Sequence, residues 1–248
     1  MKAIVYQKFG NTDVLQTVEQ PKPSIKSNQV LVKVKAVSIN PMDWKIRKGE
    51  MKLMSGSKFP KNTGVDFAGI IEDTGSDVTD FKKGDEVFGV VKNMMKEGAL
   101  ADYVSVPSSL IWKKPVHISF AQASSIPVVG SAAVTALQKM GNINAKTQIL
   151  VNGATGGFGM FLLQLLKQQG ANVTAVTSTK AVEYAKKWGA GSVIDYTKEN
   201  VLAQNIAYDI VIDLSGKMGY ANAKKIMKAR ALFLNPVPKP VEIPTSLF

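Results

Sequence analysis

The chain has 248 residues, enough for one large domain or two small ones. It contains no cysteine and one histidine, His117. These counts exclude disulfides, a thiol nucleophile and thiolate-bound metal, and they disfavour a metal site built on imidazoles. Lys and Arg number 31 against 19 Asp and Glu, a formal net charge of +12 that favours anionic partners such as nucleotide phosphates. Any chemistry is therefore supplied most simply by an organic cofactor.

The basic residues are scattered, and no basic block alternates with aromatic residues, so a nucleic-acid partner is not predicted. The apolar run in the N-terminal MKAIVYQKFG is too short for a signal peptide. Nothing approaches 18 consecutive apolar residues. We therefore expect a soluble, cytoplasmic protein without a membrane span.

Residues 1–120 are predicted to be β-rich. The start of Gln29–Ile39 (QVLVKVKAVSI) alternates apolar residues with lysine, as a half-buried strand does. Further short strands are expected at Lys2–Tyr6, Gly64–Glu72, Glu86–Val91 and Ala101–Val106. Many turns and no long helical period favour a small barrel or sandwich.

Residues 121–248 are predicted to form an α/β domain with a doubly wound parallel sheet. The expected strands are Gln148–Asn152, Asn172–Thr177, Ser192–Asp195, Tyr208–Asp213 and Ala231–Asn235. The expected helices are Val129–Met140, Gly157–Gln169, Lys180–Trp188 and Gly219–Ala229. Such domains usually have a sixth strand. The sequence therefore predicts an abbreviated sheet, truncated at the C-terminus, with an open edge near Ala231–Asn235.

The strongest motif joins the first of these strands to a helix. Its residues are Gly153, Ala154, Thr155, Gly156, Gly157, Phe158 and Gly159. From Ala154 they follow the G-x-G-x-x-G pattern with Ala in the first place. We expect residue 154 in the tight turn, Gly156 against a diphosphate, and Gly159 where helix and strand pack closely. The helix N-terminus would then hold the anion. The alternative is an ordinary glycine-rich turn.

The next strand ends in Thr177, Ser178, Thr179 and Lys180, with no acidic residue between Asn172 and Val182. An NAD site usually carries an acid there for the ribose 2′-hydroxyl. Hydroxyls and a cation suit a 2′-phosphate instead, so the sequence predicts NADP(H). Tyr196 ends the neighbouring strand and is placed to reach the same phosphate. The alternatives are a helix N-cap for Ser178 or Thr179 and an ordinary surface tyrosine for Tyr196.

The whole chain to about Pro240 resembles the zinc-free quinone oxidoreductase branch of the medium-chain dehydrogenases/reductases. The matching stretches are Ala36–Gly49 (AVSINPMDWKIRKG), Pro60–Gly89, Gly98–Pro107 (GALADYVSVP), Ile149–Gly170 and Lys187–Tyr196. Lys52–Pro60 further resembles the subgroup with chloroplast-envelope quinone oxidoreductase homologues and alkenal reductases. The resemblance implies a GroES-like catalytic domain and a Rossmann NADP-binding domain with the active site between them.

The resemblance also implies roles for single residues. Asn40 matches an asparagine beside the nicotinamide, and Lys45 a lysine that contacts cofactor and substrate; these two are the candidate catalytic residues. Zinc-dependent relatives carry Gly-His-Glu where this chain has Gly64-Val65-Asp66, so no catalytic metal is expected. Ala132 stands where relatives often have a threonine near the nicotinamide, which removes one cofactor contact.

The predicted activity is hydride transfer from NADPH to a quinone or an α,β-unsaturated carbonyl, with a small-molecule substrate and water as one source of the proton. His117 is expected to be structural or exposed. The resemblance allows a homodimer. The alternative function is a non-catalytic NADPH-binding redox sensor or scaffold.

Overall fold

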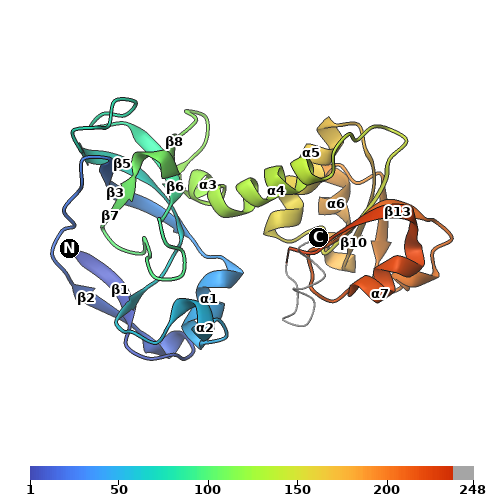
Figure 1. The fold of residues 1–248 in the computed structure, drawn as a ribbon, viewed down its shortest axis with the longest axis horizontal. Coiled ribbons are helices and arrows are strands. Elements are labelled where there is room, and N and C mark those ends of the chain that lie inside the picture. Colours follow the sequence, from blue (N-terminus) through green and yellow to red (C-terminus); the bar gives the residue numbers. More distant parts are fainter. Residues whose placement is uncertain (237–248) are drawn as a thin grey trace. The chain divides into compact units, whose positions relative to one another are not determined.

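The computed structural model describes residues 1–236. The chain forms two compact units, Met1–Val128 and the residues from Val129 onward (Figure 1). The first unit extends beyond residue 120 because helix α3 (Phe120–Ser124) packs against its strands β3 and β5. No helix among residues 1–236 is long and apolar enough to cross a bilayer.

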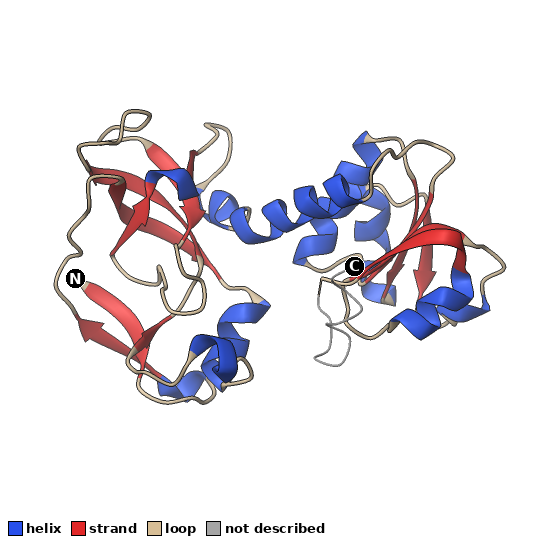
Figure 2. Ribbon diagram, viewed as in Figure 1, coloured by secondary structure: helices blue, strands red, loops and turns tan. Residues whose placement is uncertain are grey.

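The first unit contains two antiparallel sheets, drawn as red arrows in Figure 2. The five-stranded sheet has the order β7-β3-β5-β6-β8. Its strands are β3 (Gln29–Ser38), β5 (Asp66–Thr74), β6 (Glu86–Val90), β7 (Tyr103–Pro107) and β8 (Ile111–Lys113). The other sheet, of order β2-β1-β4, has β1 (Lys2–Tyr6), β2 (Leu15–Glu19) and β4 (Lys61–Asn62). The β-rich character predicted from the sequence is confirmed.

Several elements of the first unit were not predicted, namely the helices α1 (Pro41–Lys48), α2 (Lys52–Ser55) and α3 and the strands β2, β4 and β8. Helix α1 is the longest of them. Its start is fixed by Asn40, whose backbone N–H donates to Asp43 Oδ2 at 2.7 Å, and by proline at the first helical position. Gly49 ends the helix in a left-handed conformation, with φ of +84°. The β-rich first unit thus contains helices that the sequence did not predict.

The second unit is built on a five-stranded parallel sheet of order β11-β10-β9-β12-β13. Its strands are β9 (Gln148–Asn152), β10 (Asn172–Thr177), β11 (Ser192–Asp195), β12 (Tyr208–Asp213) and β13 (Met227–Leu234). The chain starts at the centre, adds two strands on one side, and returns to add two on the other. The predicted doubly wound sheet is therefore confirmed, with β13 at an edge of the described sheet.

The longer helices of the second unit agree with the prediction, and the last helix does not. The helices are α4 (Pro127–Lys139), whose first two residues belong to the first unit, α5 (Gly157–Gln168), α6 (Val182–Trp188) and α7 (Tyr220–Ala223). The helix predicted over Gly219–Ala229 stops after one turn and continues as the 3₁₀ turn Lys224–Ile226. Strand β13 begins at Met227, because pairing with β12 satisfies this segment's backbone groups.

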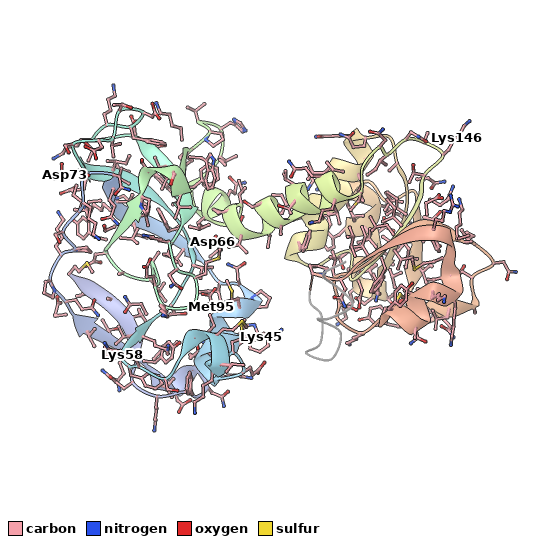
Figure 3. The ribbon with its side chains drawn as sticks, in the orientation of Figure 1. Lys45, Lys58, Asp66, Asp73, Met95 and Lys146 are labelled. Carbon is pink, nitrogen blue, oxygen red and sulfur yellow. The ribbon has the colours of Figure 1, made fainter. Side chains whose placement is uncertain are left out.

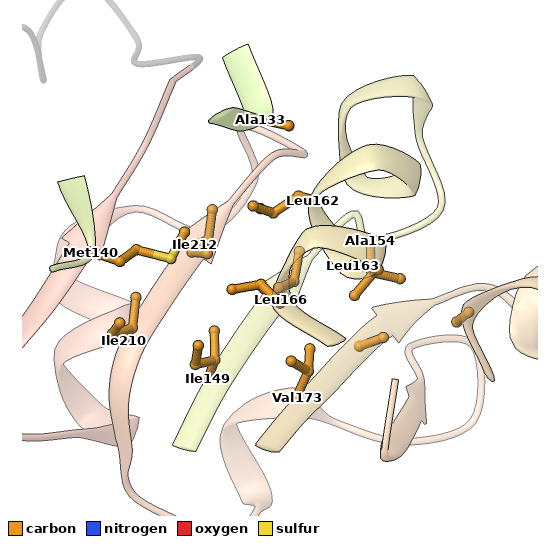
Figure 4. Packing of buried hydrophobic residues seen from close by; sticks show 13 residues of the cluster. Ala133, Met140, Ile149, Ala154, Leu162, Leu163, Leu166, Val173, Ile210 and Ile212 are labelled. Atoms are coloured by element: carbon orange, nitrogen blue, oxygen red, sulfur yellow. The ribbon is translucent and has the colours of Figure 1, made fainter. Parts of the chain in front are cut away.

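The core of the second unit lies where α5 covers the sheet (Figure 4). Leu162, Leu163 and Leu166 of α5 are fully buried in the same cluster as Ile149 and Ile212 of the sheet. Burial of each such side chain contributes about 2 kcal/mol. This packing fixes the end of β9 and the start of α5, the two sides of the predicted dinucleotide turn.

Candidate functional site

The turn between β9 and α5 has the backbone geometry of an anion-binding turn. Gly153 takes the left-handed conformation, with φ of +79°, so the glycine that makes the turn stands one position before the residue expected. Ala154 is fully buried. A Cβ at Gly159 would lie 2.2 Å from the Ala154 carbonyl oxygen, so only glycine allows this close approach. Gly156 is the N-cap of α5.

A hollow of about 870 Å³ opens beside this turn, lined by residues that follow β9, β10, β11 and β12. Six residues predicted to bind the cofactor line it, namely Gly153, Thr155, Gly156, Thr177, Ser178 and Tyr196. The carboxyl ends of parallel strands are where doubly wound sheets bind ligands. A dinucleotide fits the donors present, because the first turn of α5 offers backbone N–H groups and the positive end of the helix dipole.

A cluster of hydroxyls surrounds Asp195, the last residue of β11. Thr179 and Thr197 both donate their hydroxyls to its carboxylate. The Thr179 hydrogen bond, with those from Thr197, lowers the pKa of Asp195 below its ordinary value. The Thr179 hydroxyl is therefore engaged within the protein, and Lys198 Nζ lies 3.8 Å from the same carboxylate.

The first unit holds a second polar cluster, centred on Asp66 of β5 (Figure 3). Asp66 is fully buried, and its Oδ2 accepts from the Asn40 amide at 2.9 Å and from the Ser38 hydroxyl at 3.3 Å. Its Oδ1 accepts from the backbone N–H of Val128 at 3.1 Å. Burial raises the pKa of Asp66 to about 6, although these hydrogen bonds oppose the shift. The Asn40 side chain is thereby held in one orientation.

Lys45 lies on α1, five positions after Asn40, and is labelled in Figure 3. Its side chain is half-buried, with Nζ 5.7 Å from the centroid of the Trp44 ring. This ring face restricts the lysine without neutralising its charge. His117 is exposed, which agrees with one of the two alternatives expected for it.

The comparisons with known proteins decide the family. Residues 26–116 match the model of the alcohol dehydrogenase GroES-like domain. The structure of the quinone oxidoreductase from Coxiella burnetii superposes with a TM-score of 0.90 at 32% identity, covering 100% of this chain and 79% of that one. The chain belongs to the quinone oxidoreductase family. An Escherichia coli quinone oxidoreductase, solved in complex with NADPH, superposes with a TM-score of 0.83 at 27% identity, covering 95% of this chain and 72% of that one.

Some curated relatives of this chain are named for the reduction of alkenals. An Arabidopsis thaliana protein named NADPH-dependent alkenal/one oxidoreductase, chloroplastic, is 40% identical over 224 residues. The match covers 87% of this chain and 58% of that relative. The present chain thus spans less than two thirds of the length of this curated relative.

The predicted site residues are distributed over both units of the chain. Asn40 and Lys45 lie in the first unit, and the others lie in the second. Ala154, Gly157, Phe158, Gly159, Thr179 and Lys180 do not line the hollow. Phe158 packs against the core, and the Lys180 side chain is exposed.

Sequence reasoning missed the lining residues that follow β11 and β12. They include Lys198, Asn200, Leu202, Ser215, Lys217 and Met218. Only their position in the sequence could have indicated these residues, because each follows a predicted strand whose carboxyl end lies at the same edge of the sheet. Among residues 1–236, no three His, Asp or Glu side chains gather as metal ligands would.

Proposed function

We propose that this chain binds NADPH and reduces a quinone or an α,β-unsaturated carbonyl compound without a catalytic zinc ion. The hollow at the carboxyl ends of β9 to β12, beside the glycine turn, carries the proposal. The names of the relatives support the cofactor and both substrate classes. The absence of cysteine and the valine at position 65, where zinc-dependent relatives have histidine, support a zinc-independent reaction.

The residues around the turn would hold the nucleotide. The backbone at Gly156 and Gly157 would receive the diphosphate at the start of α5. Ser178, Lys180 and Tyr196 would bind the 2′-phosphate by hydrogen bonds and charge. The Thr179 hydroxyl already donates to Asp195. Thr179 would therefore contribute to nucleotide binding by ordering this segment and not by a direct hydrogen bond to the phosphate.

Asn40 and Lys45 would act at the reacting end. NADPH, when bound, supplies the hydride. Asn40, oriented by Asp66, would position the nicotinamide amide through its own amide group. The Lys45 ammonium would stabilise the negative charge that develops on the substrate carbonyl oxygen. Among residues 1–236 we assign no general acid to this reaction, so the proton would come from water.

The direct test mixes the purified 248-residue chain with NADPH and either 1,4-benzoquinone or an enone, and follows absorbance of the reduced nicotinamide. We expect consumption of NADPH that depends on both protein and acceptor. A control without acceptor measures NADPH loss to oxygen. NADPH binding without consumption would instead support the redox sensor or scaffold, and a folded chain that binds no NADPH would refute both functions.

Lys180→Ala should weaken NADPH about tenfold and leave NADH within twofold, because only NADPH carries the 2′-phosphate that the ammonium would pair with. Titration calorimetry with both nucleotides measures the ratio. Lys146→Ala is the matched control, since Lys146 is an exposed lysine before the amino end of β9 (Figure 3). Equal weakening of both nucleotides by Lys180→Ala would refute its assignment to the 2′-phosphate.

Three further expectations remain predictions. They are the cytoplasmic location, the lack of a nucleic-acid partner and the homodimer. The family includes chloroplastic and mitochondrial proteins, so location varies among relatives.

A further inference from the structure

Asp213, the last residue of β12, was not among the predicted site residues, yet it organises one side of the hollow. Its side chain is fully buried. Its Oδ1 accepts from the Asn152 amide at 3.0 Å and from the Ser215 backbone N–H at 3.0 Å and hydroxyl at 2.6 Å. Its Oδ2 accepts from the Met218 backbone N–H at 2.7 Å. All three partners line the hollow.

These hydrogen bonds fix the loop 214–218 against the glycine turn. A Cβ placed on Gly153 would lie 3.1 Å from the Ser215 backbone nitrogen, so the loop and the turn are in close contact. The Leu214 N–H donates to the Asn152 carbonyl oxygen at 2.9 Å, which joins the same two segments. The Ser215 hydroxyl in turn accepts from the Lys217 N–H at 3.1 Å. One carboxylate therefore connects the end of β9 to the loop that brings Lys217 to the hollow.

A carboxylate suits this position better than an amide would. Both oxygens of Asp213 face donors, and an asparagine would turn its own NH₂ group toward one of them. Hydrogen bonds to a charged acceptor are stronger than those to a neutral one, and they offset the cost of burying the charge. Replacement of Asp213 by asparagine would release one end of the loop while conserving the side-chain volume.

We propose that Asp213 is a positioning residue for the dinucleotide, holding the loop 214–218 and its cation Lys217 against the Gly153 turn so that the site is formed before the nucleotide binds. The inference rests on the proposed function, because NADPH is the ligand that the site would take. A site that is formed before binding lowers the entropy cost of ordering the loop around the nucleotide. Loss of the hydrogen bonds from Asp213 should therefore lower the affinity for the nucleotide.

The test compares Asp213→Asn with Asp209→Asn in the full chain. Asp209 lies at the other end of β12 and accepts from the Gln148 N–H at 2.9 Å and from Lys228 at 2.8 Å. Both variants remove a carboxylate from the same strand, and only the hydrogen-bond partners of Asp213 line the hollow. We expect Asp213→Asn to raise the Kd of NADPH about tenfold, and Asp209→Asn to leave it within twofold. Urea unfolding of both variants measures their stabilities.

A second variant covers the case in which Asp213→Asn does not fold. Ser215→Ala keeps the buried carboxylate and removes the hydroxyl that links it to Lys217, and Ser215 is exposed. We expect it to raise the Kd of NADPH about threefold with little change in stability. In turnover, both site variants should raise the KM for NADPH and leave kcat and the KM for the quinone within twofold.

Three results would contradict the inference, and they can be told apart. If the wild-type chain binds NADPH and the Asp213 and Ser215 variants bind it equally well, the positioning role is refuted and the proposed function stands. If affinity falls in proportion to stability in the Asp209 variant as well, the role of Asp213 is structural only. If the folded wild-type chain binds no NADPH, the proposed function fails and the positioning role fails with it.

Discussion

Gly156→Ala should weaken NADPH by about tenfold or more in a stably folded protein, whereas Gly159→Ala should destabilise the fold itself. A Cβ at Gly156 meets only the Gly153 carbonyl oxygen, at an ordinary contact distance of 3.6 Å. The added methyl group would therefore stand where the diphosphate is proposed to lie, at little cost to the free protein. Titration calorimetry measures the affinity, and urea unfolding should show a change of less than about 1 kcal/mol.

Gly159→Ala is the matched control for this prediction. The same methyl group, three residues later, would overlap backbone atoms of Ala154, with the nearest at 2.2 Å. Backbone cannot move aside as a side chain can, so we expect a loss of about 3 kcal/mol in the free energy of unfolding. Unchanged NADPH affinity in a well-folded Gly156→Ala variant would place the diphosphate elsewhere.

Stability should fall as the pH rises from about 4 to about 6, and Asp66→Asn should remove most of this slope. The folded-state pKa of Asp66, about 6, lies above its ordinary value, because burial disfavours the charged form and Asp43 repels it. The folded state therefore binds the proton more tightly than the unfolded state. Protonation stabilises the fold below the unfolded-state pKa, and this contribution is lost as the pH rises through the folded-state pKa.

The shift corresponds to a contribution of up to about 3 kcal/mol. Urea unfolding of the wild type and Asp66→Asn between pH 4 and pH 7 measures the difference in stability at each pH. Asp43, whose pKa burial also raises, is present in both proteins, so its contribution cancels from this difference apart from its repulsion of Asp66. Parallel curves for the two proteins over this range would show that Asp66 ionises normally in the folded state.

The helix α1 was within reach of sequence reasoning and was missed. Asn40, Pro41 and Asp43 form a helix start, and Gly49 is a glycine stop. The eight-residue helix is short, and its single buried apolar residue, Ile46, gives too weak a period to detect. Local signals at the ends of this helix were more informative than hydrophobic periodicity within it.

The segment after Gly219 shows the opposite error, a predicted helix that is largely absent from the structure. Alanine and lysine between Gly219 and Ala229 favour a helix by propensity. In the structure, Ala223 and Ile226 are buried against the sheet, and the chain from Met227 pairs with β12. Tertiary packing overrides propensity here because a strand beside β12 provides hydrogen-bond partners for the backbone groups along that edge of β12, which a helix could not do.

The sequence by itself determined the order of strands and helices in the second unit and the place of the glycine turn, because these depend on local periodicity and on backbone freedom at a few residues. It also determined the hydroxyl-rich end of β10 and the residues that carry the family resemblance. Only the tertiary structure decided that Asp66 accepts a hydrogen bond from Asn40, that Asp195 accepts one from Thr179, and that Asp213 accepts hydrogen bonds from the loop 214–218. The physical reason is that neighbouring segments of a sheet, or the loops at its edge, bring each carboxylate to its partners. Several of these partners lie tens of residues away along the chain, so no local sequence pattern indicates the contact.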